Sequence, residues 1–284
     1  MLGFLRKKQK EAGCGLFLRN FAEPQDSILK IASKEVVACS EDDRIIDVLA
    51  SMLSGVRRVP VVGEQGEVKG IVSATDVLSF IGAGDKSKFF TNTGLSATVK
   101  KIMEGDVNCL TETDSIPVVL EFFKMNGKPI HPVTSQKKLH SVVSETDIVN
   151  LVSKPTGVSV SRIMSAKPIV IQEDYPVRDV AKMLCRGPYR RLPVVNNGVV
   201  MGIVTPYDIL SHLNRNETLN TLAFESAPIK SIMNKDVAYV SPDADVYDAV
   251  RTMKIKKVSG LPVVDEDADL VGMISKRDII EAMC

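Results

Sequence analysis

The sequence predicts an α/β (α+β) fold built from four copies of a β-α-β-β-α unit, associated in two pairs. A proline within a Val-rich segment is followed 15 or 16 residues later by an aspartate, at Pro60/Asp76, Pro132/Asp147, Pro193/Asp208 and Pro262/Asp278. The four aspartates are 71, 61 and 70 residues apart. A repeat of this length indicates a fold assembled from similar units. The long, short, long spacing groups repeat 1 with repeat 2 and repeat 3 with repeat 4.

The third copy illustrates the elements that we expect in every repeat. They are a strand at 168–171, an amphipathic helix from 177 to a stop at Gly187, strands at 191–195 and 199–204 joined by a turn at 196–198, and a second helix after Thr205. Near-continuous Val/Ile strands predict a sheet that helices cover. Because one unit of ~60 residues has only a marginal core, we expect the units to pair.

The repeats divide nearly the whole chain. An Ile-Met dipeptide, called the landmark below, lies near the start of three of them, at Ile102–Met103, Ile163–Met164 and Ile232–Met233, and Ile31–Ala32 takes its place in the first. The predicted divisions are a leader at 1–25 and repeats 1 to 4 at 26–82, 98–153, 158–214 and 228–284. Repeats 1 and 2 are expected to form one tandem module and repeats 3 and 4 a second.

Composition excludes several classes of protein. The formal net charge of the 284 residues is +1, which argues against a strongly basic nucleic-acid binder. No apolar run approaches the ~18 residues that span a bilayer. Five cysteines without a C-x-x-C motif indicate reduced thiols in the cytoplasm and no structural metal. Of the histidines, we expect His131 to lie in a loop and His140 on the surface.

The most regular polar feature is Ser/Thr-x-x-Asp, where a strand turns into a helix. It occurs at 73–76, 144–147, 205–208 and 275–278. One interpretation is a capping box, in which the acidic side chain returns to the amide of the N-cap residue. The other is a ligand site, because an acidic side chain can accept hydrogen bonds from ribose hydroxyls and a helix N-terminus attracts anions.

The four copies of this motif and of the proline-centred strand resemble the CBS domain. Four such units in one chain resemble the gamma subunit of AMP-activated protein kinase and its stand-alone archaeal relatives. The resemblance implies a flat, disk-like assembly and adenosine ligands in clefts between paired units. It also implies that no catalytic domain is present, since the repeats use nearly the whole chain, and therefore that the chain is not an enzyme.

The resemblance assigns site residues in three groups. The motif would hold ribose and phosphate through Ser73, Thr75, Asp76, Ser144, Thr146, Asp147, Thr205, Asp208, Ser275, Lys276 and Asp278. The start of the proline-centred strand would meet phosphate through Arg57, Arg58, Arg190 and Arg191, with His131, Ser259 and Gly260 in repeats 2 and 4. The strand after the Ile-Met landmark would line the adenine slot with Val37, Asn108, Ile169 and Ala238. Ser141, where the other repeats have glycine, is expected to crowd the second site.

The resulting hypothesis is a cytoplasmic, energy-sensing protein that binds AMP, ADP or ATP. The resemblance implies a regulated protein partner of unknown identity and leaves a homodimer open. One alternative is a CBS protein that binds S-adenosylmethionine or methylthioadenosine. Another is a nucleic-acid-binding regulator with a basic groove formed by Lys100, Lys101, Lys137, Lys138, Lys256 and Lys257.

Overall fold

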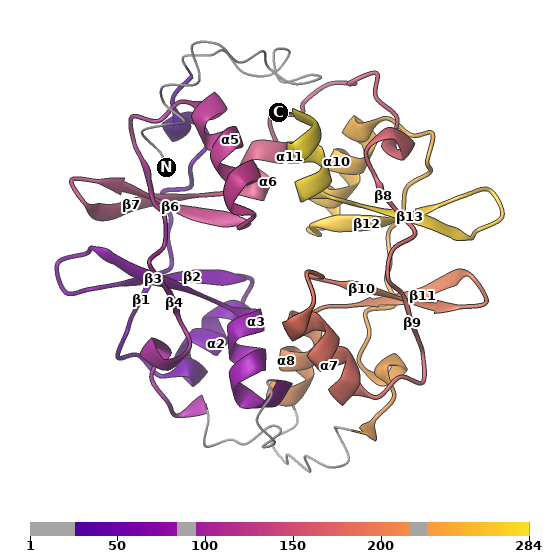
Figure 1. Cartoon of the computed structure of the whole chain (residues 1–284), viewed down its shortest axis with the longest axis horizontal. Helices are drawn as coiled ribbons and strands as arrows, with labels where there is room; N and C mark the ends of the chain where they lie inside the picture. The colour runs from indigo at the N-terminus through magenta and orange to yellow at the C-terminus, as the bar shows by residue number, and fades with distance from the viewer. Residues whose placement is uncertain (1–25, 84–94, 216–225, 284) are drawn as a thin grey trace. The chain divides into compact units, whose positions relative to one another are not determined.

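The computed structural model describes residues 26–83, 95–215 and 226–283, and the expected leader at 1–25 lies outside them. The chain divides into two compact units, and each combines alternate repeats (Figure 1). The odd unit, Val37–Val107 and Ile169–Val237, holds repeats 1 and 3. The even unit, Met1–Val36, Asn108–Pro168 and Ala238–Cys284, holds repeats 2 and 4.

The odd unit has the predicted order of elements in both of its repeats. Repeat 1 contains β1 (Cys39–Ser40), α2 (Ile45–Leu53), β2 (Arg58–Val62), β3 (Val68–Ser73) and α3 (Ala74–Leu78). Repeat 3 contains β9 (Ile171–Gln172), α7 (Val177–Arg186), β10 (Leu192–Asn196), β11 (Val199–Val204) and α8 (Pro206–Arg215). The helices α3, α7 and α8 pack against one another and join the two repeats.

The even unit repeats this plan. Repeat 2 contains β5 (Leu110–Thr111), α5 (Ile116–Asn126), β6 (Ile130–Ser135), β7 (Lys138–Ser144) and α6 (Glu145–Val149). Repeat 4 contains α10 (Val246–Ile255), β12 (Gly260–Val264), β13 (Leu270–Ser275) and α11 (Lys276–Met283), and Val240 forms a parallel bridge to Val263 where the first strand is expected. Helix α11 packs against α5 and α6.

Local sequence signals position the elements of repeat 3 as predicted, apart from the first strand and a shift of one residue in β10, which was expected at 191–195. Helix α7 ends at Gly187, and β11 has the expected bounds. Asn197 and Gly198 have φ values of 48° and 87°, which suit a tight hairpin turn. The strand expected at 168–171 is wrong in extent, because only β9 at its end pairs with β10, through Ile171 and Val194.

Each unit has its own apolar core, shared by its two repeats. In the odd unit the core contains Leu49 of α2 and Leu184 of α7, which are both 2% exposed. In the even unit it contains Phe122 of α5 and Ile279 of α11, both fully buried. The need of small units for a shared core is therefore met by alternate repeats. The tandem modules of consecutive repeats stay a prediction.

The landmark segments are exchanged between consecutive repeats. In the even unit, Ser33 pairs with Val142, and β8 (Ser165–Ala166) pairs with β13. In the odd unit, β4 (Glu104–Gly105) pairs with β3, and Asn234 pairs with Ile203. Repeats 1 and 2 thus exchange their landmark segments, and repeats 3 and 4 do the same, so that each segment pairs with a strand of the other repeat.

Three glycines allow this exchange. A Cβ atom added at Gly70, Gly202 or Gly272 would lie 3.1, 2.6 or 2.5 Å from the Sδ atom of Met103, Met233 or Met164, respectively. Repeat 2 has Ser141 at the equivalent position, and the equivalent of the methionine is Ala32. Ser141 is fully buried in the strand pair. Repeat 2 thus has a larger residue in the strand and a smaller one in the dipeptide.

Candidate functional site

The four Ser/Thr-x-x-Asp motifs have the same local geometry. The N–H of Ser73 donates to Oδ2 of Asp76 at 2.8 Å, and its hydroxyl donates to the same oxygen at 2.6 Å. The corresponding distances are 2.7 and 2.6 Å for Ser144 with Asp147 and for Thr205 with Asp208. Ser275 makes both bonds to Asp278 as well. The capping-box interpretation is therefore confirmed for the acidic side chain.

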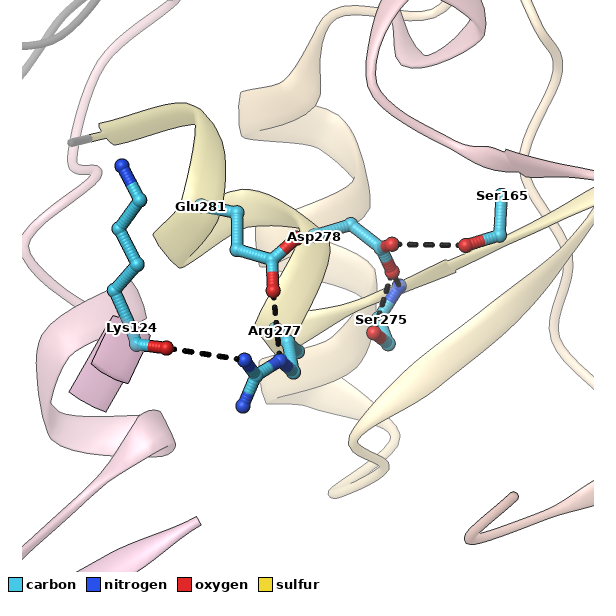
Figure 2. A network of polar contacts seen from close by, with 6 residues as sticks. All are labelled: Lys124, Ser165, Ser275, Arg277, Asp278 and Glu281. Carbon is cyan, nitrogen blue, oxygen red and sulfur yellow. Dashed lines mark hydrogen bonds and ion pairs between the residues drawn. The ribbon is translucent and has the colours of Figure 1, made fainter. Parts of the chain in front are cut away.

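The capping bonds use Oδ2 and leave the second carboxylate oxygen outside the box. In repeat 4 this oxygen has a different partner, because the hydroxyl of Ser165 donates to Oδ1 of Asp278 at 3.0 Å (Figure 2). A capping box and a ligand site are thus compatible in one residue, since each carboxylate oxygen accepts more than one hydrogen bond.

The two motif aspartates of the odd unit lie in partly desolvated surroundings. Burial raises the pKa of Asp76 above its ordinary value, although Ser73 and the Arg58 guanidinium lower it. Burial likewise raises the pKa of Asp208, against the hydrogen bonds from Thr205 and the positive charge of Arg57. The free chain thus holds two carboxylates whose ionised forms are short of solvation, as is common at functional sites.

Arg57 belongs to repeat 1, whereas Asp208 belongs to repeat 3. The charge of Arg57 acts on Asp208, and the two repeats pack together here, since the Tyr207 hydroxyl donates to the carbonyl of Leu53 at 2.8 Å. Leu53 ends α2, and Arg57 and Arg58 follow it at the start of β2. The odd unit therefore brings an arginine of one repeat to the motif of the other. Arg190 and Arg191, at the equivalent positions of repeat 3, are half-buried.

The even unit lacks arginines at the equivalent positions. Counted from the strand proline, Pro129 and Ile130 stand there in repeat 2, and Ser259 and Gly260 in repeat 4. Gly260 is buried at the start of β12.

The expectation that His131 lies in a loop is wrong. It lies on β6 and is 2% exposed, with its ring centroid 4.6 and 4.7 Å from those of Phe122 and Phe123. The strand alternation and the two rings of α5 pull the imidazole into the core, so this side chain packs rather than faces a phosphate. His140 is exposed, as expected.

The basic residues of the fourth motif contact repeat 2. The Lys276 ammonium donates to the Thr146 hydroxyl at 2.7 Å. Arg277 pairs with Glu281 at 2.7 Å and donates to the Lys124 carbonyl at 3.3 Å, near the end of α5 (Figure 2). Arg277 thus supplies a donor to a carbonyl in the last turn of another helix. Lys276 brings a positive charge to the motif of repeat 2.

The expected adenine-slot residues share a position and differ in exposure. Val37 and Ile169 are 44% and 46% exposed despite their apolar side chains. Asn108 is exposed and its side-chain amide donates to Asn126 at 3.3 Å, and Ala238 is half-buried. Exposed apolar side chains at matched positions of repeats 1 and 3 provide surface that a flat apolar ring could cover.

Sequence reasoning missed one position beside the motif, the residue that follows the landmark dipeptide. It is Ser33, Glu104, Ser165 or Asn234, and each pairs with the same position of a neighbouring repeat. Ser165 bonds Asp278, and the Glu104 charge raises the pKa of Asp76. The constant spacing after the landmark was the signal that could have identified this position.

Three further features of the described residues concern thiols, metal ligands and membrane-spanning helices. Burial raises the pKa of the Cys39 thiol to about 11 and that of Cys185 to about 12, so these thiols are protonated at neutral pH. Across residues 26–83, 95–215 and 226–283, no group of three or more His, Cys, Asp or Glu residues could hold a metal ion. No helix in that part of the chain is both long and apolar enough to cross a membrane.

Comparison with known proteins gives the family. The CBS domain pattern matches residues 28–83, 99–154, 160–215 and 229–284. An uncharacterized protein of Methanocaldococcus jannaschii, MJ1225, is 27% identical over 275 residues, which cover 89% of this chain and 98% of that protein. Its crystal structure, described as a candidate archaeal homolog of g-AMPK, superimposes with a TM-score of 0.84 over 91% of this chain and all of that one.

Two further relatives match over different shares of their length. An uncharacterized 33.4 kDa protein of Thermofilum pendens is 29% identical over 258 residues, 84% of each chain. The homoserine O-acetyltransferase of Methanococcoides burtonii is 34% identical over 125 residues, but these are only 24% of that enzyme. The similarity to that enzyme is thus confined to a minor part of it, whereas MJ1225 and the Thermofilum pendens protein match over most of their length. The chain belongs to the CBS domain family and carries four copies of the domain.

Proposed function

We propose that this protein is a regulatory protein that binds adenine nucleotides, AMP, ADP or ATP, and signals their relative levels to a protein partner. The observation that carries the proposal is the motif geometry. In all four repeats a carboxylate is fixed by two hydrogen bonds to Oδ2 at the junction of a strand and a helix. A rigid carboxylate with a second oxygen can accept hydrogen bonds from vicinal ribose hydroxyls.

The charges of the odd unit support a phosphorylated ligand. Arg57 acts on Asp208 and Arg58 acts on Asp76, so each carboxylate has a guanidinium in its electrostatic surroundings. Guanidinium groups bind phosphate oxygens with two parallel hydrogen bonds. A nucleotide would thus place ribose on the aspartate and phosphates toward the arginines. Exchange among nucleotides that differ in phosphate number would make the protein responsive to energy state.

The direct test is isothermal titration calorimetry of the full chain, stripped of any co-purifying small molecule, with AMP, ADP and ATP. We expect saturable binding that is weakened by replacing motif aspartates with asparagine. Guanine nucleotides serve as the matched ligand control, because they share ribose and phosphate but differ in the base. Absence of heat for every adenine nucleotide would refute the proposal.

The even unit supports a second candidate, an adenosine ligand with no phosphate, such as methylthioadenosine or S-adenosylmethionine. Its motifs keep Asp147 and Asp278, but Pro129, Ile130, Ser259 and Gly260 replace the arginines. Ribose contacts need only the aspartates. Titration with both thionucleosides separates the candidates, since only these ligands should bind independently of the arginines.

Nucleic acid is the weaker alternative. Lys100, one of the six lysines expected to form a basic groove, pairs with Glu41 at 2.9 Å. That pairing offsets part of the charge that phosphate binding requires. A gel-shift assay over a salt series would detect such binding.

A further inference from the structure

The four motif aspartates have different neighbours, although their capping boxes are alike. The difference comes from two places, the residue after the landmark dipeptide and the start of the proline-centred strand. The residue after the dipeptide lies beside a motif in all four repeats, because it pairs with the equivalent strand position each time. The pairs are Val142–Ser33, Ile71–Glu104, Met273–Ser165 and Ile203–Asn234. The same ligand would therefore meet four different environments.

In repeat 4 the carboxylate oxygen outside the capping box is already used. Ser165 donates to Oδ1 of Asp278 at 3.0 Å, while Ser275 holds Oδ2 (Figure 2). A ribose hydroxyl must displace or share this hydrogen bond. Because no arginine stands at 259–260, little phosphate attraction offsets that cost.

In repeat 1 a second carboxylate opposes an anionic ligand. Glu104 lies in β4 beside β3, and its charge acts on Asp76 in the direction opposite to Arg58. A nucleotide phosphate at this site would gain from the arginine and lose to the glutamate. The site has the residue types for ribose but a reduced preference for negative charge.

In repeat 2 a residue of the motif already has a hydrogen-bond partner from repeat 4. Lys276 donates to the Thr146 hydroxyl at 2.7 Å, and the adjacent Glu145 is 6% exposed. The positions that hold arginines in the odd unit are Pro129 and Ile130 here. This arrangement offers one lysine where repeats 1 and 3 each offer two arginines.

Repeat 3 combines the favourable features. The bond from Tyr207 to the Leu53 carbonyl brings its motif to the end of α2, from which the chain continues to Arg57. The landmark residue that pairs beside its motif, with Ile203, is Asn234, which is uncharged and whose Oδ1 accepts the N–H of Asp236 at 3.0 Å. The positive charge of Arg57 therefore acts on Asp208, and no carboxylate stands at the landmark position beside this motif.

We propose that repeat 3 holds the primary nucleotide site, a polyphosphate site with ribose on Asp208 and with Arg57 of repeat 1 as a phosphate-binding residue. This inference rests on the proposed function and adds a ranking of the four sites. It also assigns specificity to the residue after the landmark, since Ser165 and Glu104 weaken the sites of repeats 4 and 1.

The ranking is tested by calorimetric titration of the full chain with ATP, comparing the wild type with single Asp-to-Asn variants at 76, 147, 208 and 278. We expect D208N to weaken the tightest ATP-binding step at least about tenfold, and the other three variants to change it by less than about threefold. R57Q should weaken the same step. Arg57 is exposed, so this second variant tests the site without disturbing a capping box. R44Q is the matched control, because Arg44 is also exposed and pairs with Asp47 on α2.

Two substitutions test the weaker sites in the opposite direction. S165A should strengthen ATP binding at repeat 4, and E104Q should strengthen it at repeat 1, each visible as an added or tighter binding step. E64Q makes the same charge change at an exposed position in the β2–β3 turn and should add no step. If the tightest ATP-binding step is unchanged in both D208N and R57Q, the ranking of the sites is wrong, but the proposed function still stands. The absence of any ATP step in the wild type would overturn the proposed function with it.

Discussion

The hydroxyl of Tyr207 donates to the carbonyl of Leu53 across the two repeats of the odd unit, at 2.8 Å. Tyr207 immediately precedes Asp208, and Leu53 is the last residue of α2. The last carbonyls of a helix have no partner within it, so the tyrosine satisfies one of them. One side chain thereby links the motif of repeat 3 to the helix that leads to Arg57.

Removing this hydroxyl should loosen the odd unit. We expect Y207F to lower the free energy of unfolding by about 1 kcal/mol, because a half-buried carbonyl loses its donor while the ring stays in place. Urea denaturation followed by circular dichroism measures the change. Y175F is the control, since Tyr175 is 42% exposed. An equal effect of the two substitutions would contradict the role assigned to Tyr207.

Asp208 should reduce the stability of the ligand-free chain at neutral pH. Its folded-state pKa is raised by burial, so its contribution to stability is fully present below the unfolded pKa of about 3.9 and is lost as the pH rises through the folded pKa. D208N removes the charge, so we expect a higher Tm than the wild type at pH 7 and a smaller difference on acidification. Differential scanning fluorimetry across pH measures both. D174N, at an exposed position, should show no such pattern.

The glycines under the landmark methionines should differ in tolerance of a methyl group. A Cβ at Gly272 would meet Met164 Sδ at 2.5 Å, whereas a Cβ at Gly70 would meet the Glu104 carbonyl oxygen at 2.6 Å. A side chain can move but a strand backbone cannot, so G70A should cost more than G272A, within the usual range of about 1–3 kcal/mol for overpacking.

A double-mutant cycle extends this prediction. M164A should recover part of the loss in G272A, because it removes the Sδ atom that the added methyl group would meet, with a coupling of about 1 kcal/mol from chemical denaturation. M103A should not recover G70A, because the backbone contact remains. Additivity in the Gly272–Met164 pair would show that the two residues do not compete for space.

Gly127 should resist substitution for two reasons. Its φ of 65° is left-handed, and an added Cβ would lie 2.9 Å from Nη1 of Arg277. We therefore expect G127A to destabilise the protein by about 1 kcal/mol or more in thermal or urea unfolding. G105A is the control, because a Cβ there would meet nothing within 4 Å. A neutral G127A would contradict both reasons, the left-handed backbone strain and the contact with Arg277.

The sequence by itself determined the features that depend on neighbouring residues. The Ser/Thr-x-x-Asp boxes, the end of α7 at Gly187 and the turn at Asn197–Gly198 involve groups within a few positions of each other. Their geometry is set by backbone dihedrals and short hydrogen bonds, so residue type and spacing predict them. The fourfold repeat then predicts the same geometry four times.

Only the tertiary structure decided which repeats share a core and which charges reach each motif. The charge of Arg57 acts on Asp208, Ser165 donates to Asp278 and Lys276 donates to Thr146, and each pair lies more than 100 positions apart in the sequence. The burial of His131 likewise depends on the rings of α5 that pack beside β6. Such contacts follow from the packing of whole helices and sheets, which minimises exposed apolar surface over the entire unit. For this reason the repeated motif predicted one capping geometry four times, and packing gives each capping box different neighbours.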